Sequence, residues 1–268
     1  MKETKVVPIR YPWAMSYCCM TLVKGEKNIL IDTAFEESIS PFLEEKLKKE
    51  GLTLQDIDFV FNTHSHSDHV EGNEKIVKES SAKVFIHPAG GAAPHIKELA
   101  GNVQYFSDGE KISGCTIFFT PGHSADSVCI LEENTSTLII GDSIEGRGSG
   151  FAGVALIHDP ASYLESIQKI RQLYEAGRVK RVIFSHKTDG FGDEVEGENT
   201  GKFLDASEET CSKYIAFTKD LLRSEPEITI ERAGALLREN FAVTSNIISP
   251  GTADGIARIF LEYCRKLP

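Results

Sequence analysis

The segment from His64 to His69 places three histidines and one aspartate within six consecutive positions, shortly after an apolar run. In an extended chain, side chains two positions apart project to the same side, so we expect His64 and His66 to share one metal ion. Asp68 and His69 follow where the chain turns into a helical pattern, and we expect them to face a second ion. Imidazole together with carboxylate is a ligand set typical of zinc, iron or manganese.

Three more candidate ligands, His123, Asp142 and His186, come directly after apolar, strand-like runs. Loops at the ends of strands converge at one edge of an open α/β sheet, which is where such folds build binding sites. Gly122 and Gly141 precede two of these residues and permit a tight turn or a close backbone approach. The sequence therefore predicts one site assembled from remote strand ends.

The elements that must position these side chains form an α/β pattern, in which short strands alternate with helices. From about Phe203 three helical patterns follow without a strand, so we expect a catalytic domain over residues 1–202 and a helical extension over residues 203–268 that packs on it. The polar, glycine-rich segment 190–201 is expected to be a loop or boundary. The strands are expected over residues 16–23, 28–32, 57–62, 83–86, 103–106, 115–120, 127–131, 137–140 and 181–184, those from 103 to 140 pairing antiparallel, and helices over 41–50, 69–80 and 160–176.

Taken together, these motifs resemble the metallo-β-lactamase-fold hydrolase superfamily over about residues 15–190. The resemblance rests on the HxHxDH pattern at 64–69, the "LIDT" segment at 30–33 and three later motifs in the same order. The later motifs are Gly-His-Ser at 122–124, Gly-Asp at 141–142 and Ser-His at 185–186. The last one departs from the frequent Gly-His-Gly-Pro form, because Ser-His-Lys-Thr stands here.

The resemblance implies a four-layer αββα sandwich with two divalent metal ions at one edge, zinc by default and iron or manganese as alternatives. It implies that a metal-bridging hydroxide attacks the substrate, since a bound ion lowers the pKa of its water from about 15.7 to about 7 and two ions can share the resulting hydroxide. Asp68 is then the catalytic residue that orients this hydroxide and passes a proton to the leaving group. The implied ligands are His64, His66 and His123 for the first ion, and Asp68, His69 and His186 for the second, with Asp142 bridging.

Composition limits the partners and the compartment. The 268 residues include 29 basic and 40 acidic ones, and the resulting charge of −11 disfavours a nucleic-acid partner. We see no apolar stretch of signal-peptide or membrane-span length, so the expected location is the cytoplasm, without a membrane partner. The six cysteines are scattered, which favours reduced thiols in the core over disulfides or metal ligation.

Several residues near these motifs have a simpler interpretation. We expect His87, His95 and His158 to be structural or surface histidines, and Asp32 either to hold a histidine ring or loop amide of the site or to be purely structural. Ser124 lies in a sequence similar to the serine-hydrolase GxSxG motif. Aspartate replaces the final glycine and the expected strand-to-helix context is missing, so the metal-dependent interpretation is favoured.

The substrate is the least determined feature. Thioester hydrolases of the glyoxalase II kind carry a Gly-Cys-Gly-Arg-like stretch where this chain has Gly-Arg-Gly-Ser at 146–149, which argues against glutathione recognition. Arg147 in that stretch either binds a substrate carboxylate or is an exposed loop residue. The helical extension would favour a small substrate if it narrows the metal cleft. We therefore expect hydrolysis of a small-molecule carboxyl ester, thioester or lactone; the alternatives are a phosphodiesterase or nuclease of the same fold, or a non-hydrolytic di-iron redox or metal-binding protein. The sequence predicts no oligomeric state.

Overall fold

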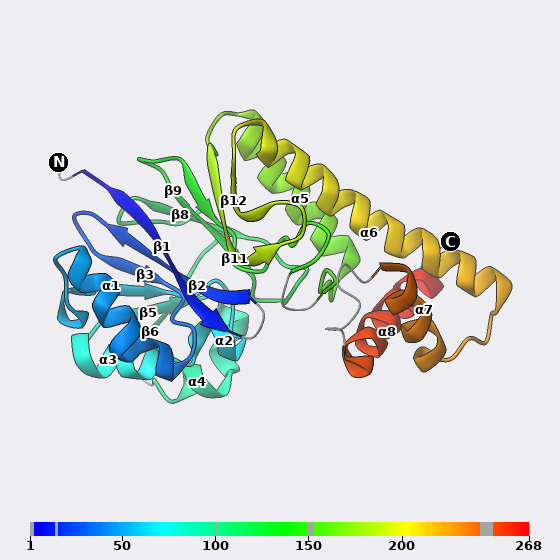
Figure 1. The fold of residues 1–268 in the computed structure, drawn as a ribbon, viewed down its shortest axis with the longest axis horizontal. Coiled ribbons are helices and arrows are strands. Elements are labelled where there is room, and N and C mark those ends of the chain that lie inside the picture. The colour runs from blue at the N-terminus through cyan, green and yellow to red at the C-terminus, as the bar shows by residue number, and fades with distance from the viewer. Residues whose placement is uncertain (1–2, 14–15, 100, 150–152, 242–248, 268) are drawn as a thin grey trace.

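The computed structural model describes residues 3–13, 16–99, 101–149, 153–241 and 249–267. Within these ranges, two six-stranded mixed sheets pack face to face and helices cover their outer faces (Figure 1). The four-layer sandwich expected from the sequence is therefore confirmed, and so are the helices at the C-terminal end of the chain.

The first sheet has the strand order β1-β2-β3-β4-β5-β6. Its first three strands pair antiparallel, and β3 to β6 pair parallel. In the parallel part, the carboxyl ends of the strands lie at one edge of the sheet. The candidate site lies at this edge. The strands are β1 (Lys5–Trp13), β2 (Ser16–Lys24), β3 (Ile29–Ile31), β4 (Phe59–Phe61), β5 (Lys83–Ile86) and β6 (Val103–Tyr105).

The second sheet has the order β12-β11-β10-β9-β8-β7. All its neighbouring strands pair antiparallel except β10 and β11, which are parallel because helix α5 (Pro160–Glu175) connects them. The strands are β7 (Lys111–Ile112), β8 (Cys115–Phe119), β9 (Val128–Glu132), β10 (Thr137–Ile139), β11 (Arg181–Thr188) and β12 (Gly192–Glu196).

Three apolar layers hold the sandwich together. The inner layer lies between the sheets and combines residues of both, such as Phe61 of β4 and Ile130 of β9. One outer layer joins the first sheet to helices α1 to α4, and the other joins the second sheet to α5, α6 and α8. The helices are α1 (Glu44–Lys49), α2 (Ser67–Val70), α3 (Asn73–Ser80), α4 (Pro94–Lys97), α5 (Pro160–Glu175), α6 (Glu198–Ser224), α7 (Ile230–Phe241) and α8 (Pro250–Lys266).

Alternation along the strands explains how one sheet serves two layers. In β2, Cys19 and Val23 belong to the inner layer, whereas Cys18, Met20 and Leu22 face the helices on the outside. This is the two-residue periodicity of a strand whose two faces are both covered. All six cysteines of the chain are buried and free, as the sequence predicted.

Three sequence-based expectations about the strands were wrong. The segment at 103–106 is not antiparallel to its successors; β6 pairs parallel with β5 in the first sheet. The segment 190–201 is not a loop, because it contains β12 and the start of α6. Its charged side chains concealed the strand: β12 is an edge strand, and Glu194 pairs with Arg181 and Arg10 instead of packing in a core.

The third error concerns β11. The sequence suggested that this strand ends at Phe184, but it continues to Thr188, so His186 lies inside the strand. The pairing of β11 with β12 shifts register between Ile183 and Thr188. Strand β1 was not expected at all, because Pro8 and Pro12 interrupt it; both are tolerated at this edge of the sheet.

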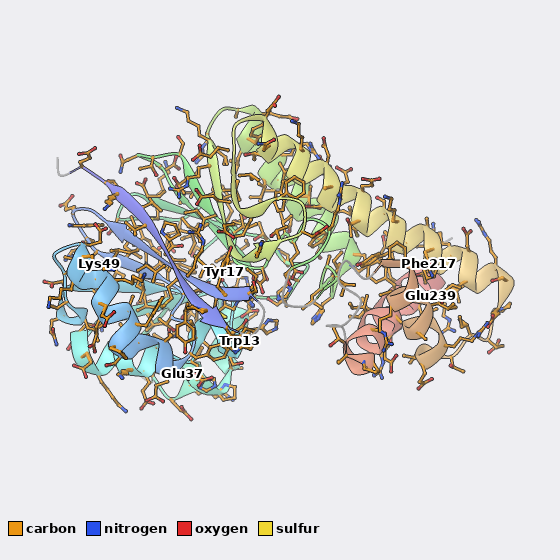
Figure 2. The ribbon with its side chains drawn as sticks, viewed as in Figure 1. Trp13, Tyr17, Glu37, Lys49, Phe217 and Glu239 are labelled. Carbon is orange, nitrogen blue, oxygen red and sulfur yellow. The ribbon has the colours of Figure 1, made fainter. Side chains whose placement is uncertain are left out.

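The C-terminal helices extend to one side of the sandwich (Figure 1). Phe217 of α6 and Glu239 of α7 lie in this part, away from Tyr17 of β2 (Figure 2). Helices α6 and α8 nevertheless contribute Phe203, Tyr214 and Phe260 to the outer layer of the second sheet. The division at residues 202 and 203 stays a prediction, and α6 runs through it. None of the helices in the described part of the chain combines the length and apolar character needed to cross a membrane.

Candidate metal centre

The site forms where the ends of strands from both sheets meet. Asp32 directly follows β3, and its backbone amide donates to the Phe61 carbonyl of β4 at 2.9 Å. The chain then passes through Thr63, whose carbonyl accepts a hydrogen bond from Val128 of the second sheet at 2.8 Å. These bonds fix the segment His64–His69 relative to both sheets.

The first group of ligand candidates consists of His64, His66 and His123, as the sequence predicted for one ion. Nδ1 of His66 lies 2.9 Å from Nε2 of His64 and 3.1 Å from Nε2 of His123. The opposite ring nitrogen of His64 contacts the hydroxyl of Thr63 at 3.2 Å. That hydroxyl donates to Asp32 at 2.7 Å, so it accepts from His64 Nδ1–H and leaves a lone pair on Nε2.

The second group consists of Asp68, His69, Asp142 and His186. Oδ2 of Asp68 lies 3.3 Å from Nε2 of His186 and 3.7 Å from Nε2 of His69. Oδ2 of Asp142 lies 3.4 and 3.5 Å from the same two nitrogens. The structure therefore brings together all seven residues that the sequence singled out; their role as ligands stays a prediction.

Asp142 stands between the two groups. Its Oδ2 is also 3.9 Å from Nε2 of His123, which belongs to the first group. Gly141 makes this position accessible, because its φ of +55° lies in the left-handed region and a Cβ there would be 2.5 Å from Oγ1 of Thr63. One carboxylate thus faces histidines of both groups, which is the geometry a bridging ligand needs.

The outer nitrogens of the histidine rings are held by the protein. Nδ1 of His69 contacts Oδ2 of Asp32 at 2.8 Å, and Nδ1 of His186 donates to the main-chain carbonyl of Tyr17 at 2.7 Å. Asp32 also accepts from the Thr63 amide at 2.8 Å. Asp32 therefore holds both a histidine ring and a loop amide, and it leaves Nε2 of His69 directed at the cluster.

Burial and interactions among the cluster residues shift their pKa values. Burial, with His69 and His123 adding to it, keeps the pKa of His64 well below its ordinary value. Burial alone would lower the pKa of His186, but Asp142 raises it to about 10. Burial alone would raise the pKa of Asp142, yet His186 and His69 hold it well below its ordinary value. Carboxylates of this kind stay ionised and can bind a cation.

This donor set fits divalent metal ions on its own chemistry. Three ring nitrogens converge on one point, and a single proton between them cannot satisfy all their lone pairs. Nε2 of His69 is buried and makes no hydrogen bond within the described residues, which is costly unless a cation occupies that side. Nitrogen and carboxylate donors together suit zinc, iron or manganese.

The residues of the cluster differ in their exposure to solvent. His66 is exposed and Asp68 is half-buried, whereas His64, His69, His123, Asp142 and His186 are buried. His158 is exposed, and its ring lies parallel to that of His123 at 5.9 Å between centroids. Among the residues named here, solvent therefore reaches the cluster at His66 and Asp68, with His158 nearby.

The remaining sequence candidates lie outside the cluster. His87 caps the short helix at 88–92 by accepting from the Ala89 amide, and its ring contacts Phe119. The Ser124 hydroxyl is 2.7 Å from both Asp126 and Ser127, in a turn between two strands, so the strand-to-helix context of a serine hydrolase is missing. His95 is in α4.

Arg147 is exposed, and its guanidinium lies 3.7 Å from where a Cβ on Gly190 would be. Sequence reasoning missed two functional contacts: the Tyr17 carbonyl on His186, and the buried carboxylate of Glu145, which lies 3.0 Å from Nδ1 of His123. A carbonyl leaves no trace in residue types. The signal for Glu145 was its position, three residues after Asp142 in an otherwise apolar and glycine-rich stretch.

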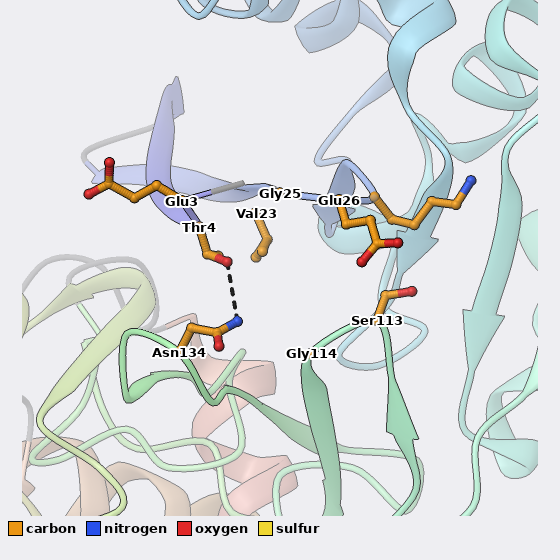
Figure 3. Close-up of a pocket in the computed structure, with 9 residues that line it drawn as sticks. Glu3, Thr4, Val23, Gly25, Glu26, Ser113, Gly114 and Asn134 are labelled. Carbon is orange, nitrogen blue, oxygen red and sulfur yellow. Dashed lines mark hydrogen bonds between the residues drawn. The ribbon is translucent and has the colours of Figure 1, made fainter. Parts of the chain in front are cut away.

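A cavity of about 560 Å³ lies at the end of the strands opposite to the candidate metal centre (Figure 3). It is lined by the chain before β1 and by the turns that contain Gly25, Ser113 and Asn134. The side chain of Asn134 donates there to Thr4 at 3.2 Å. The lining includes neither histidine nor cysteine, so the cavity lacks the groups that distinguish the metal centre.

Comparisons with known proteins agree with this geometry. Hydroxyacylglutathione hydrolase of Nostoc sp. is 28% identical over 218 residues, which cover 75% of this chain and 78% of that protein. Lactamase-like protein vrtG of Penicillium aethiopicum is 29% identical over 158 residues, covering 56% of this chain. That match spans only 45% of the fungal protein's length.

The likeness of fold extends through the C-terminal helices. The crystal structure of a metallo-beta-lactamase family protein from Thermus thermophilus superposes with a TM-score of 0.71 at 18% identity. The superposition covers 98% of this chain and 93% of that one. The family model of the metallo-beta-lactamase superfamily matches residues 17–186, which include every residue of the two clusters. This chain therefore belongs to the metallo-beta-lactamase superfamily.

Proposed function

We propose that this protein is a dinuclear metal-dependent hydrolase that cleaves a small carboxyl ester, thioester or lactone. One observation carries the proposal: two adjoining donor groups, one of three histidines and one of mixed histidine and carboxylate, are linked by Asp142. Two divalent ions held in this way, zinc by default, supply Lewis acidity and lower the pKa of a coordinated water to about 7.

The protein's own residues divide the remaining work. His64, His66 and His123 would hold the first ion, and Asp68, His69 and His186 would hold the second, with Asp142 facing histidines of both groups. Asp68 is on the solvent side of the second group, 3.3 Å from His186. From there its carboxylate orients the attacking water and then carries a proton to the leaving group as general acid.

The substrate class follows from the opening and from one relative. Among the donors of the centre only His66 is exposed, so a compact reacting group fits better than a polymer. The Nostoc relative is named for hydroxyacylglutathione, an acyl derivative of glutathione. We propose an acyl substrate without glutathione, because the stretch 146–149 is Gly-Arg-Gly-Ser where glutathione thioesterases carry a Gly-Cys-Gly-Arg-like stretch. The net charge of −11 also argues for a small molecule over a nucleic acid.

A substrate panel tests the proposal. The full chain is loaded separately with zinc, manganese or iron and assayed on a p-nitrophenyl ester, an acyl thioester, a γ-lactone and bis-p-nitrophenyl phosphate. We expect turnover of at least one acyl substrate that disappears with a chelator. Asp68→Asn, assayed where its metal content equals that of the wild type, should lower kcat by about 10²- to 10⁴-fold.

His95→Ala is the matched control, because this half-buried histidine lies outside both donor groups and should leave turnover unchanged. Phosphodiester turnover with inert acyl substrates would reassign the protein to the phosphodiesterases. A fully metal-loaded protein that hydrolyses nothing on the panel would favour a redox or metal-binding role instead.

A further inference from the structure

Glu145 is a buried carboxylate next to the metal centre and has no role in the proposed reaction. It lies three positions after Asp142 and is only 5% exposed. Its Oε1 is 3.0 Å from Nδ1 of His123, and its Oε2 accepts the Leu156 amide at 3.0 Å. Its own backbone amide donates to the Tyr163 hydroxyl at 3.1 Å. Burying a carboxylate is costly, so contacts of this quality call for a reason.

Glu145 is close enough to be considered a third carboxylate ligand, since it groups with His123 and Asp142. The orientation of the His123 ring excludes Glu145 as a metal ligand, because Glu145 contacts the ring nitrogen that faces away from the cluster. Nδ1 of His123 also lies 3.0 Å from the main-chain carbonyl of Leu156, so this nitrogen carries a hydrogen and cannot bind a metal. The metal-facing nitrogen is Nε2, which points to His66 and Asp142 from the other side of the ring.

The two acceptors on Nδ1 therefore fix the tautomer of His123. A carboxylate that accepts the outer N–H of a metal-binding histidine orients the ring and increases the basicity of the inner nitrogen. His64 has only a hydroxyl at that position and His186 a carbonyl. In the first group of donors, His123 alone has a carboxylate behind it among the contacts described above.

We propose that Glu145 is a positioning residue for His123 and thereby sets the affinity of the first metal ion. This inference rests on the metal binding proposed above, but not on the identity of the substrate. The inference also assigns a role to the segment that follows Asp142, because residues of this segment hold the His123 ring. The turn carries Glu145 inward, and Leu156 returns to supply both an amide to Glu145 and a carbonyl to His123.

The support of this arrangement comes from the helical layer. Tyr163 of α5 is buried and holds the Glu145 backbone. Val154 and Ala155, just before Leu156, pack in the same apolar cluster as Tyr214 of α6 and Phe260 of α8. The helices of the second sheet thus hold the carboxylate against the ring, which a mobile loop would not do.

Zinc affinity of the full chain tests the proposal directly. The wild type and Glu145→Gln are titrated with zinc against a chromophoric competitor. The glutamine keeps the shape of the side chain, but its amide cannot accept from both Leu156 N–H and His123 Nδ1–H. We expect one of the zinc sites to weaken by about 10- to 100-fold.

Glu132→Gln is the matched control. Glu132 is equally buried and accepts hydrogen bonds from the Asn134 and Thr135 amides, at the far end of β9. It should bind zinc as the wild type does. In ¹⁵N-histidine NMR spectra of the zinc-loaded proteins, one ring N–H signal should shift in Glu145→Gln and not in the control.

Tyr163→Phe provides a second variant in case Glu145→Gln does not fold. It removes the acceptor of the Glu145 amide and should weaken the same zinc site by about fivefold, the worth of one hydrogen bond. Zinc binding by Glu145→Gln at wild-type affinity would overturn the inference, and so would an equal loss in Glu132→Gln. If the wild type itself bound none of the three metals, the proposed function would fail as well, which separates the two results.

Discussion

Asp32 and His69 are 37 positions apart in the chain, yet Oδ2 of the aspartate lies 2.8 Å from Nδ1 of the histidine, and both side chains are buried. Asp32 adopts this position at a φ of +58°, in the left-handed backbone region that residues other than glycine rarely occupy. The end of β3 is therefore shaped to direct one imidazole nitrogen at the metal centre.

We expect Asp32→Asn to weaken metal binding by about 10- to 100-fold, because the amide oxygen can still accept the Thr63 N–H but the amide nitrogen that replaces Oδ2 cannot accept from His69 or the Thr63 hydroxyl. Asp32→Ala should in addition lower the free energy of unfolding by about 1–3 kcal/mol, since the buried Thr63 amide loses its acceptor. Zinc titration and urea denaturation measure the two effects.

Asp58→Asn is the control for this pair. Asp58 also accepts a backbone amide, that of Asn28, but at the opposite end of β3. Its substitution should leave zinc affinity unchanged. Equal zinc affinities for Asp32→Asn and the wild type would show that the contact with His69 is purely structural.

Asp142 and His66 should differ in how many ions they hold. Asp142 faces histidines of both groups, so Asp142→Asn is expected to weaken both ions. The His66 ring contacts His64 and His123 of the first group, so His66→Ala should remove one ion and keep the other. Metal content measured by plasma mass spectrometry after dialysis distinguishes the two; identical stoichiometries would refute the bridging position.

Metal removal should destabilise the protein, because ions that bind only the folded state add to its stability. Free zinc at 100 times its dissociation constant raises the free energy of unfolding by about 2.7 kcal/mol for one site. We expect a higher Tm with zinc than with a chelator, and a smaller difference in His66→Ala. A Tm that is indifferent to zinc, manganese and iron would argue against any ion at the cluster.

Gly141→Ala should cost more than its backbone conformation alone explains. A left-handed alanine costs about 1–2 kcal/mol, and the new Cβ would also lie 2.5 Å from Oγ1 and 2.6 Å from Cβ of Thr63. Such overpacking costs a further 1–3 kcal/mol, approximately. Gly177→Ala is the control: its φ is +73°, and a Cβ there meets nothing within 4 Å. Chemical denaturation should show the difference, and equal losses would mean that Thr63 simply moves.

The helical extension is predicted to unfold together with the sandwich. Phe260 of α8 is fully buried in the cluster that also contains Leu138 of β10 and Ile167 of α5. Phe260→Ala should therefore lower stability by about 3–5 kcal/mol in a single transition, whereas Arg258→Ala, at an exposed position of the same helix, should change little. Two separate unfolding transitions would instead indicate an independent helical unit.

The sequence by itself indicated the kind of site that this protein carries. The spacing of His64, His66, Asp68 and His69 identified candidate metal ligands, and the apolar runs before His123, Asp142 and His186 indicated where three more candidates lie. Local patterns of this kind are readable because a strand end and its loop lie within a few residues of each other. Edge strands were harder: in β12 only Val195 lies in an apolar cluster among charged neighbours, and in β1 the prolines interrupt a pattern whose buried centre is Ile9, so neither segment resembles a typical strand.

Only the tertiary structure decided which groups hold the outer nitrogens of the candidate histidine ligands. The contacts of Asp32 with His69, of Tyr17 with His186 and of Glu145 with His123 join segments that are remote in the chain. Neither a carbonyl acceptor nor a second carboxylate has a sequence spacing of its own, because such contacts depend on how the two sheets and the helical layer pack. Residue types indicated a metal site, and packing fixed which ring nitrogen of each histidine faces the cluster.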